Sequence, residues 1–129
     1  MGAISERFRL TAKALEKLHE LVVLDDLTEV ERDALIQRFE FSFEILWKAA
    51  KDYLFEVEGV NVSSPKKVIR ACFEQGVLTE EETRLAIKMT DARNLTTHTY
   101  DEEFAEELMS KIGEYEQLMQ KWFSRMQEN

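Results

Sequence analysis

Hydrophobic residues recur every three or four positions along almost the whole chain, the spacing typical of helices that bury one face. Phe39, Phe43, Leu46 and Ala50 show the pattern most clearly. Residues 39–44 alternate like a strand, but the helical spacing on both sides outweighs that short alternation. The pattern predicts five helices, over residues 5–24, 28–57, 64–76, 79–99 and from 101 to the C-terminus.

Residues at the predicted helix ends have side chains suited to those positions. Ser64 before Pro65 favours a helix start, and Thr79 with Glu82 forms a capping-box pattern. Asp101, followed by two glutamates, is a suitable N-cap for the last helix. One proline and four glycines also argue against a turn-rich sheet protein. We therefore expect a single domain over residues 1–129, an all-α, up-and-down four-helix bundle with one short additional helix.

The longest predicted helix, residues 28–57, has apolar residues on two sides. Phe41, Ile45 and Phe55 fall roughly opposite the Phe39–Phe43 stripe at 100° per residue. A helix of this kind lies at the centre of its bundle or packs against a partner. We expect these three residues to form the interface of a homodimer.

Charge and composition restrict the class of protein. The formal net charge is −9, which counts against a protein that coats nucleic acid but fits a partner for a basic protein surface. The single cysteine, Cys72, falls on an apolar helix face and indicates a buried thiol. No apolar stretch is long enough to span a bilayer, and the N-terminus lacks the apolar segment of a signal peptide. We expect a cytoplasmic protein that binds no membrane.

Candidate chemistry concentrates in one segment at the end of the fourth predicted helix. It contains Arg93, Asn94, His98 and Tyr100 among several threonines. Such a segment suits metal-independent RNA cleavage: a histidine near neutral pKa moves the proton of a ribose 2′-hydroxyl, and a guanidinium binds the phosphate as charge develops. No metal cluster and no cofactor motif is evident.

Spacing alone leaves a structural alternative open. Five residues along an ideal helix place Arg93 and His98 about 140° apart. They converge only if the helix loosens near Thr97, if the long arginine side chain wraps round the helix, or if a dimer combines two copies. In the alternative, Arg93 pairs with an acid such as Asp91 or Glu103, and His98 only caps the helix.

Three motifs resemble one known family along nearly the whole chain. They are residues 38–48 (RFEFSFEILWK) with 51–54 (KDYL), residues 64–70 (SPKKVIR) and residues 91–100 (DARNLTTHTY). The sequence is similar to the nucleotidyltransferase substrate-binding proteins, the HepT-like branch of the HEPN superfamily (higher eukaryotes and prokaryotes nucleotide-binding).

The resemblance implies a homodimeric helical bundle that partners a minimal nucleotidyltransferase. It assigns Arg93 and His98 as the ribonuclease pair of toxin members, with Asn94 as a supporting polar residue and RNA as substrate. Tyr100 matches the tyrosine that the partner adenylylates in some members, which silences the toxin. The older family name implies instead a non-catalytic subunit that presents substrate to the nucleotidyltransferase, so enzyme and adaptor both remain open.

Overall fold

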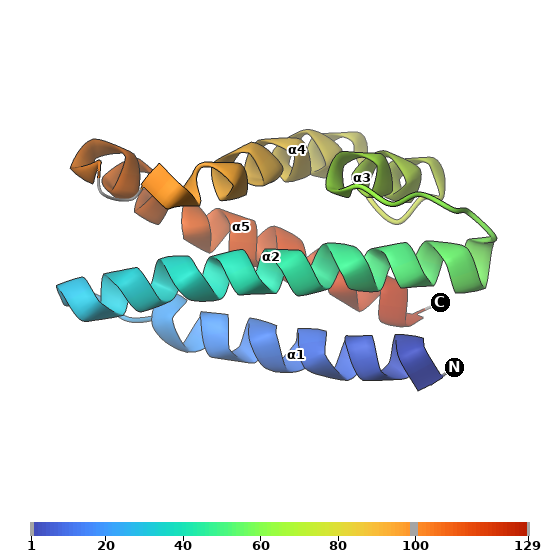
Figure 1. The fold of residues 1–129 in the computed structure, drawn as a ribbon, viewed down its shortest axis with the longest axis horizontal. Helices are drawn as coiled ribbons and strands as arrows, with labels where there is room; N and C mark the ends of the chain where they lie inside the picture. Colours follow the sequence, from blue (N-terminus) through green and yellow to red (C-terminus); the bar gives the residue numbers. More distant parts are fainter. Residues whose placement is uncertain (1, 99–100, 129) are drawn as a thin grey trace.

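The computed structural model describes residues 2–98 and 101–128 and contains no strand within them. Figure 1 shows four long helices that lie alongside one another and alternate in direction, with a shorter helix beside the fourth. The five α-helices and one 3₁₀ helix are α1 (Gly2–Val22), α2 (Glu29–Glu58), α3 (Pro65–Glu74), α4 (Glu80–Asn94), η1 (Thr96–His98) and α5 (Glu102–Glu128). The predicted all-helical class with five α-helices is confirmed. No helix in the described ranges has the length and apolarity that crossing a membrane requires.

Most helix starts follow the predicted capping chemistry. Thr79 closes the predicted capping box with Glu82, and Thr28 closes a further one with Glu31 that the sequence analysis did not name. Asp101 Oδ1 accepts hydrogen bonds from the backbone N–H groups of Glu103 and Phe104, at 3.1 and 3.3 Å. Ser64 is the N-cap of α3 but makes no side-chain capping hydrogen bond, so the start of that helix depends on the proline at its first turn.

The fourth helix is shorter than predicted. It ends at Asn94 rather than near Thr99, and η1 follows it. The N–H of Leu95 bonds to the carbonyl of Ala92 at 3.1 Å, a tightened turn that ends the α-helical pattern. The helix therefore changes before Thr97, as a convergence of Arg93 and His98 would require.

Helix α2 occupies the centre of the bundle and packs against α1, α3, α4 and α5. This position explains why its sequence is apolar on two sides. Phe39 and Phe43 are fully buried, and Ile45, which the helical projection placed on the opposite side, is also buried at 9% exposure. Each large apolar side chain buried in this way stabilises the fold by about 1.5–3 kcal/mol.

Candidate functional site

Arg93 lies in the last turn of α4 and pairs with an acid on α2. Its Nε is 2.9 Å from Oε1 of Glu44, an ion pair in which the N–H is not directed to form a hydrogen bond. The two side chains are 30% and 32% exposed. The structural alternative named Asp91 or Glu103 as the acid; the structure instead shows Glu44, while Asp91 pairs with Lys66 at 2.7 Å.

The rest of the guanidinium is available for a ligand. Among the residues that the structure describes, none accepts a hydrogen bond from either Nη group of Arg93. The closest approach of Glu44 to the guanidinium is at the Nε atom. The opposite edge, formed by the two Nη groups, has the donor geometry that a phosphate accepts.

Glu44 is itself fixed by neighbours on its own helix. The indole Nε1 of Trp47 donates a hydrogen bond to its Oε2 at 3.3 Å, and Nζ of Lys48 is 4.0 Å from the same oxygen. An acid held by a half-buried tryptophan loses less side-chain entropy when it pairs with an arginine. The position of the Arg93 side chain thus depends on α2 as well as on α4.

A second acid on α2 holds the segment that follows Arg93. The hydroxyl of Thr96 is 2.5 Å from Oε2 of Glu40 and 2.8 Å from the carbonyl oxygen of Arg93. Glu40 and Glu44 are four residues apart and lie on the same side of α2. Together they bind the end of α4 and the start of η1, a role that the sequence analysis did not assign. The only signal for it in the sequence was the pair of acids four residues apart inside an apolar helix.

The remaining predicted site residues are described to different extents. Asn94 is exposed at the end of α4, and the backbone of His98 ends η1. The side chain of His98, and Tyr100 as a whole, lie outside the described residues. The structure thus locates the side chain of Arg93, while its convergence with His98 stays a prediction.

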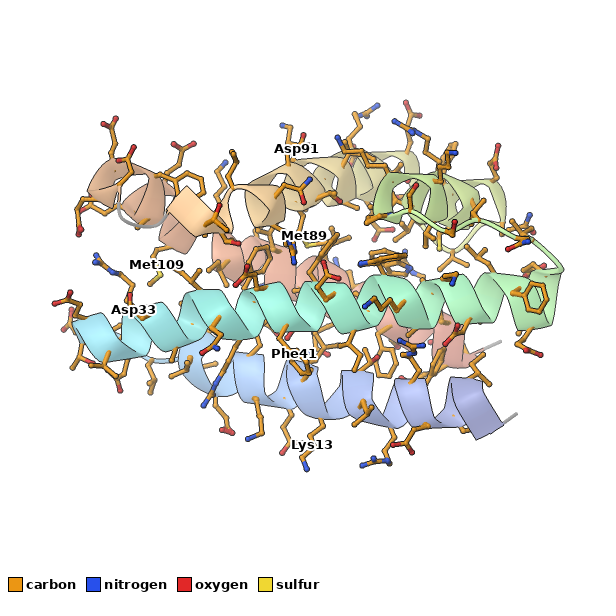
Figure 2. The ribbon with its side chains drawn as sticks, in the orientation of Figure 1. Lys13, Asp33, Phe41, Met89, Asp91 and Met109 are labelled. Carbon is orange, nitrogen blue, oxygen red and sulfur yellow. The ribbon has the colours of Figure 1, made fainter. Side chains whose placement is uncertain are left out.

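The three predicted interface residues differ in exposure. Phe41 is 60% and Phe55 57% exposed, whereas Ile45 belongs to the core. Figure 2 shows Phe41 between α1 and α2, and it lines a shallow cavity of about 220 Å³ between those helices. Only Phe41 and Phe55 are thus available on the surface, and their interface role stays a prediction.

Two other side chains could in principle react, the thiol of Cys72 and the imidazole of His19, and their surroundings give each of them a structural explanation. Burial raises the pKa of the Cys72 thiol to about 12, so it is a buried thiol as predicted and not a nucleophile. His19 is exposed, with Nδ1 3.3 Å from Oε2 of Glu116 on α5. No group of three or more metal-ligating side chains occurs within residues 2–98 and 101–128.

The fold and this segment define a class of protein: an all-helical bundle with an arginine–histidine segment where the fourth helix ends. The chain belongs to the family described as "Nucleotidyltransferase substrate binding protein like", whose model matches residues 6–128. This family is part of the HEPN/HepT branch and implies association with a nucleotidyltransferase partner.

Chains of several solved structures resemble this one, among them the following two. A crystal structure of a protein from Thermus thermophilus is 48% identical, with a TM-score of 0.88 over 90% of this chain and 98% of that one. HI0074 from Haemophilus influenzae, described as having the fold of a substrate-binding domain of a nucleotidyltransferase, is 16% identical. Its TM-score is 0.63 over 98% of both chains, which shows a shared fold. None of the curated proteins compared is significantly similar to the chain.

Proposed function

We propose that this protein is a metal-independent endoribonuclease of the HEPN toxin type, with Arg93 and His98 as the catalytic residues. Asn94 supports the site, and two copies of the segment line one cleft across a homodimer axis. The observation that carries the proposal is the Arg93 guanidinium, which Glu44 approaches most closely at Nε while neither Nη group donates a hydrogen bond to a described residue.

The reaction needs only proton transfer and charge stabilisation. His98 accepts the proton of a ribose 2′-hydroxyl, whose oxygen attacks the adjacent phosphorus; the bond to the 5′-oxygen breaks, and that oxygen leaves with a proton. The products are a 2′,3′-cyclic phosphate and a 5′-hydroxyl. The Nη groups of Arg93 donate to the phosphate oxygens as negative charge grows in the transition state.

Control of this site is assigned to Tyr100 and the nucleotidyltransferase partner. Transfer of an adenylyl group from ATP to the phenol oxygen releases pyrophosphate and leaves a phosphate and a bulky base on the motif. The new negative charge, seven residues along the chain from Arg93, competes with RNA phosphate for the cation.

RNA cleavage by the purified protein in the presence of a metal chelator tests the proposal. Wild type is expected to cleave, and Arg93→Ala and His98→Ala are expected to lose at least about 100-fold of that activity. Arg84→Ala, at an exposed arginine paired with Glu80 on the same helix, is the control that should keep it. Absence of cleavage by wild type, or equal cleavage by both alanine variants, would overturn the ribonuclease assignment.

A second candidate is a non-catalytic subunit that binds substrate for, or adapts to, a nucleotidyltransferase. The net charge of −9 favours this candidate, because it disfavours binding of RNA phosphates and favours a basic protein. In that case the double variant Arg93→Ala/His98→Ala still binds the nucleotidyltransferase and supports its transfer reaction.

A further inference from the structure

The negative charge of the chain is concentrated at one end of the bundle. Residues 23–33 and 101–107 carry ten of the 26 acidic side chains and only one, Arg32, of the 17 basic ones. Their net charge of −9 equals that of the whole chain, so the rest of the chain has equal numbers of acidic and basic residues. The two segments meet at this end, where Nη1 of Arg32 donates to Oε1 of Glu102 at 2.8 Å. Figure 1 shows the α1–α2 connection and the first turns of α5 on the same side of the molecule.

The same end has apolar side chains on its surface. Val23 is 58%, Leu24 44% and Val30 78% exposed, and all three lie within the acidic segment 23–33. Isolated exposed apolar residues need no explanation. Three within eight residues, beside a concentration of acids, form a mixed surface of the kind found at protein interfaces.

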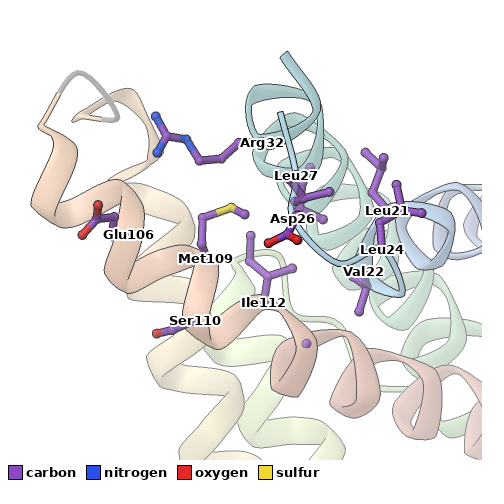
Figure 3. A pocket seen from close by; sticks show the side chains of 12 residues that line it. Leu21, Val22, Leu24, Asp26, Leu27, Arg32, Glu106, Met109, Ser110 and Ile112 are labelled. Atoms are coloured by element: carbon purple, nitrogen blue, oxygen red, sulfur yellow. The ribbon is translucent and has the colours of Figure 1, made fainter. Parts of the chain in front are cut away.

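A pocket of about 480 Å³ opens at this end between the α1–α2 connection and α5. Figure 3 shows Met109 and Ile112 directed from α5 toward Leu27, while Arg32 extends across toward the first turns of α5. Because Glu102 pairs with the Arg32 guanidinium through both carboxylate oxygens, at 2.8 and 3.4 Å, this cation offers little charge to an anion.

Gly113 contributes to the size of this pocket. It lines the wall on α5, and a Cβ added there would be 4.0 Å from Cγ1 of Val22, so a side chain at this position begins at an ordinary contact distance. A volume of this size holds one large apolar side chain of another protein. With acids around it, the pocket suits an apolar side chain that projects from a basic surface.

We infer that this acidic end is the docking surface for a basic face of the nucleotidyltransferase partner, which inserts one apolar side chain into the pocket between Leu27 and Met109. The inference rests on the partnership in the proposed function and names its surface. RNA does not fit this surface, because its phosphates meet ten acids.

The location also suits the proposed modification. Tyr100 is covalently attached to Asp101, and Asp101 begins the acidic segment 101–107. A partner docked on this end is therefore close to the point where the Tyr100 segment joins α5. Docking at the opposite end would place the transferase the length of α5 away, and that helix spans about 40 Å.

Filling the pocket tests the apolar part of the inference without weakening the fold. Gly113→Leu replaces a poor helix former inside α5 by a good one and places its side chain in the cavity. Binding of the partner nucleotidyltransferase, measured by calorimetry, is expected to weaken at least tenfold, while the melting temperature does not fall. Ala12→Leu, at an exposed position of α1, is the matched control that should bind normally.

Charge reversal tests the electrostatic part. Asp33→Lys/Glu106→Lys is expected to weaken binding at least tenfold and to reduce its dependence on salt. The control variant Glu56→Lys/Glu58→Lys makes the same charge change at the end of α2. It should leave the affinity and its dependence on salt unchanged. The inference would be overturned if Gly113→Leu and Asp33→Lys/Glu106→Lys both bind the transferase as tightly as wild type does. It would also be overturned if the wild-type chain does not bind the transferase. A chain that binds the transferase but leaves RNA uncut refutes the ribonuclease and leaves the docking surface standing.

Discussion

The Nε atom of Arg93 at the end of α4 lies 2.9 Å from Oε1 of Glu44 in the middle of α2. An arginine that only needed neutralisation could meet an acid through its two Nη groups, which form the stronger fork-to-fork pair. The closest contact, at Nε, instead orients the guanidinium, and neither Nη group donates a hydrogen bond to a described residue. The ion pair therefore positions Arg93 and joins the candidate site to the central helix of the bundle.

Replacement of Glu44 by glutamine should impair catalysis more than substrate binding. Glutamine keeps the size of the side chain but loses the charge that holds Nε, so the guanidinium samples more orientations. We expect kcat for RNA cleavage to fall roughly 10- to 100-fold, with a smaller change in KM. Glu44→Asp should recover part of the loss.

Glu56→Gln, at an exposed acid of the same helix, is the control for this measurement. If Glu44→Gln instead cleaves faster than wild type, Glu44 competes with phosphate for Arg93, and the positioning role is wrong.

The exposed aromatic residues of α2 predict where two chains meet. Phe41 is 60% exposed in the monomer, and a charge at this position would be buried in the expected dimer interface. Phe41→Glu should therefore convert the expected dimer to a monomer in light scattering. The free energy of unfolding of the monomer should change little, since Phe41 contributes little to the core.

Two comparison variants separate dimerisation from folding. Ile45→Glu places a charge in the core and should unfold the chain, whereas Val30→Glu, at an exposed site on the acidic end, should leave the dimer intact. A dimer that persists in Phe41→Glu would move the interface to another face.

Acid should weaken the contact between Glu82 and Arg125. Hydrogen bonding from Arg125 is the largest of the causes that lower the pKa of the Glu82 carboxyl, from its ordinary value of 4.5 to about 2. Nη2 of Arg125 donates to Oε2 of Glu82 at 2.9 Å, and Nη1 contacts Oε1. Because the folded chain has the lower pKa, this contribution to stability is complete above pH 4.5. It disappears as the pH falls through about 2.

Glu82→Gln isolates this effect, since glutamine at the same position still supports the capping box. At pH 7 we expect the variant to be less stable by about 1–3 kcal/mol in urea unfolding. The difference from wild type should shrink between pH 4.5 and 2, the ordinary and lowered pKa values of Glu82. If the difference in stability between Glu82→Gln and wild type stays constant from pH 4.5 to 2, the contact between Glu82 and Arg125 is not its source.

The sequence predicted the parts of the fold that depend on neighbouring residues. Thr79 and Glu82 are three positions apart, so their capping box is visible in the sequence alone. The end of α4 was placed too late, because it depends on Thr96 and Glu40, which are 56 positions apart and meet only in the folded bundle. The partner of Arg93 was missed for the same reason: side chains from two helices were needed to choose Glu44 over nearer acids.

The burial of the other tyrosines makes the proposed modification specific to Tyr100. The chain has three tyrosines, and Tyr53 and Tyr115 are 1% and 5% exposed within the core. Burial also raises the pKa of the Tyr115 hydroxyl, so a smaller fraction of it is ionised to the phenolate that would accept an adenylyl group. Incubation with the nucleotidyltransferase and ATP should add the mass of one adenylyl group to wild type and no mass to Tyr100→Phe. The control Tyr115→Phe, if folded, should be modified as wild type is. In parallel assays the modified wild type should lose RNA cleavage, and Tyr100→Phe should keep it in the presence of the transferase. Modification that persists in Tyr100→Phe would move the control point to another residue.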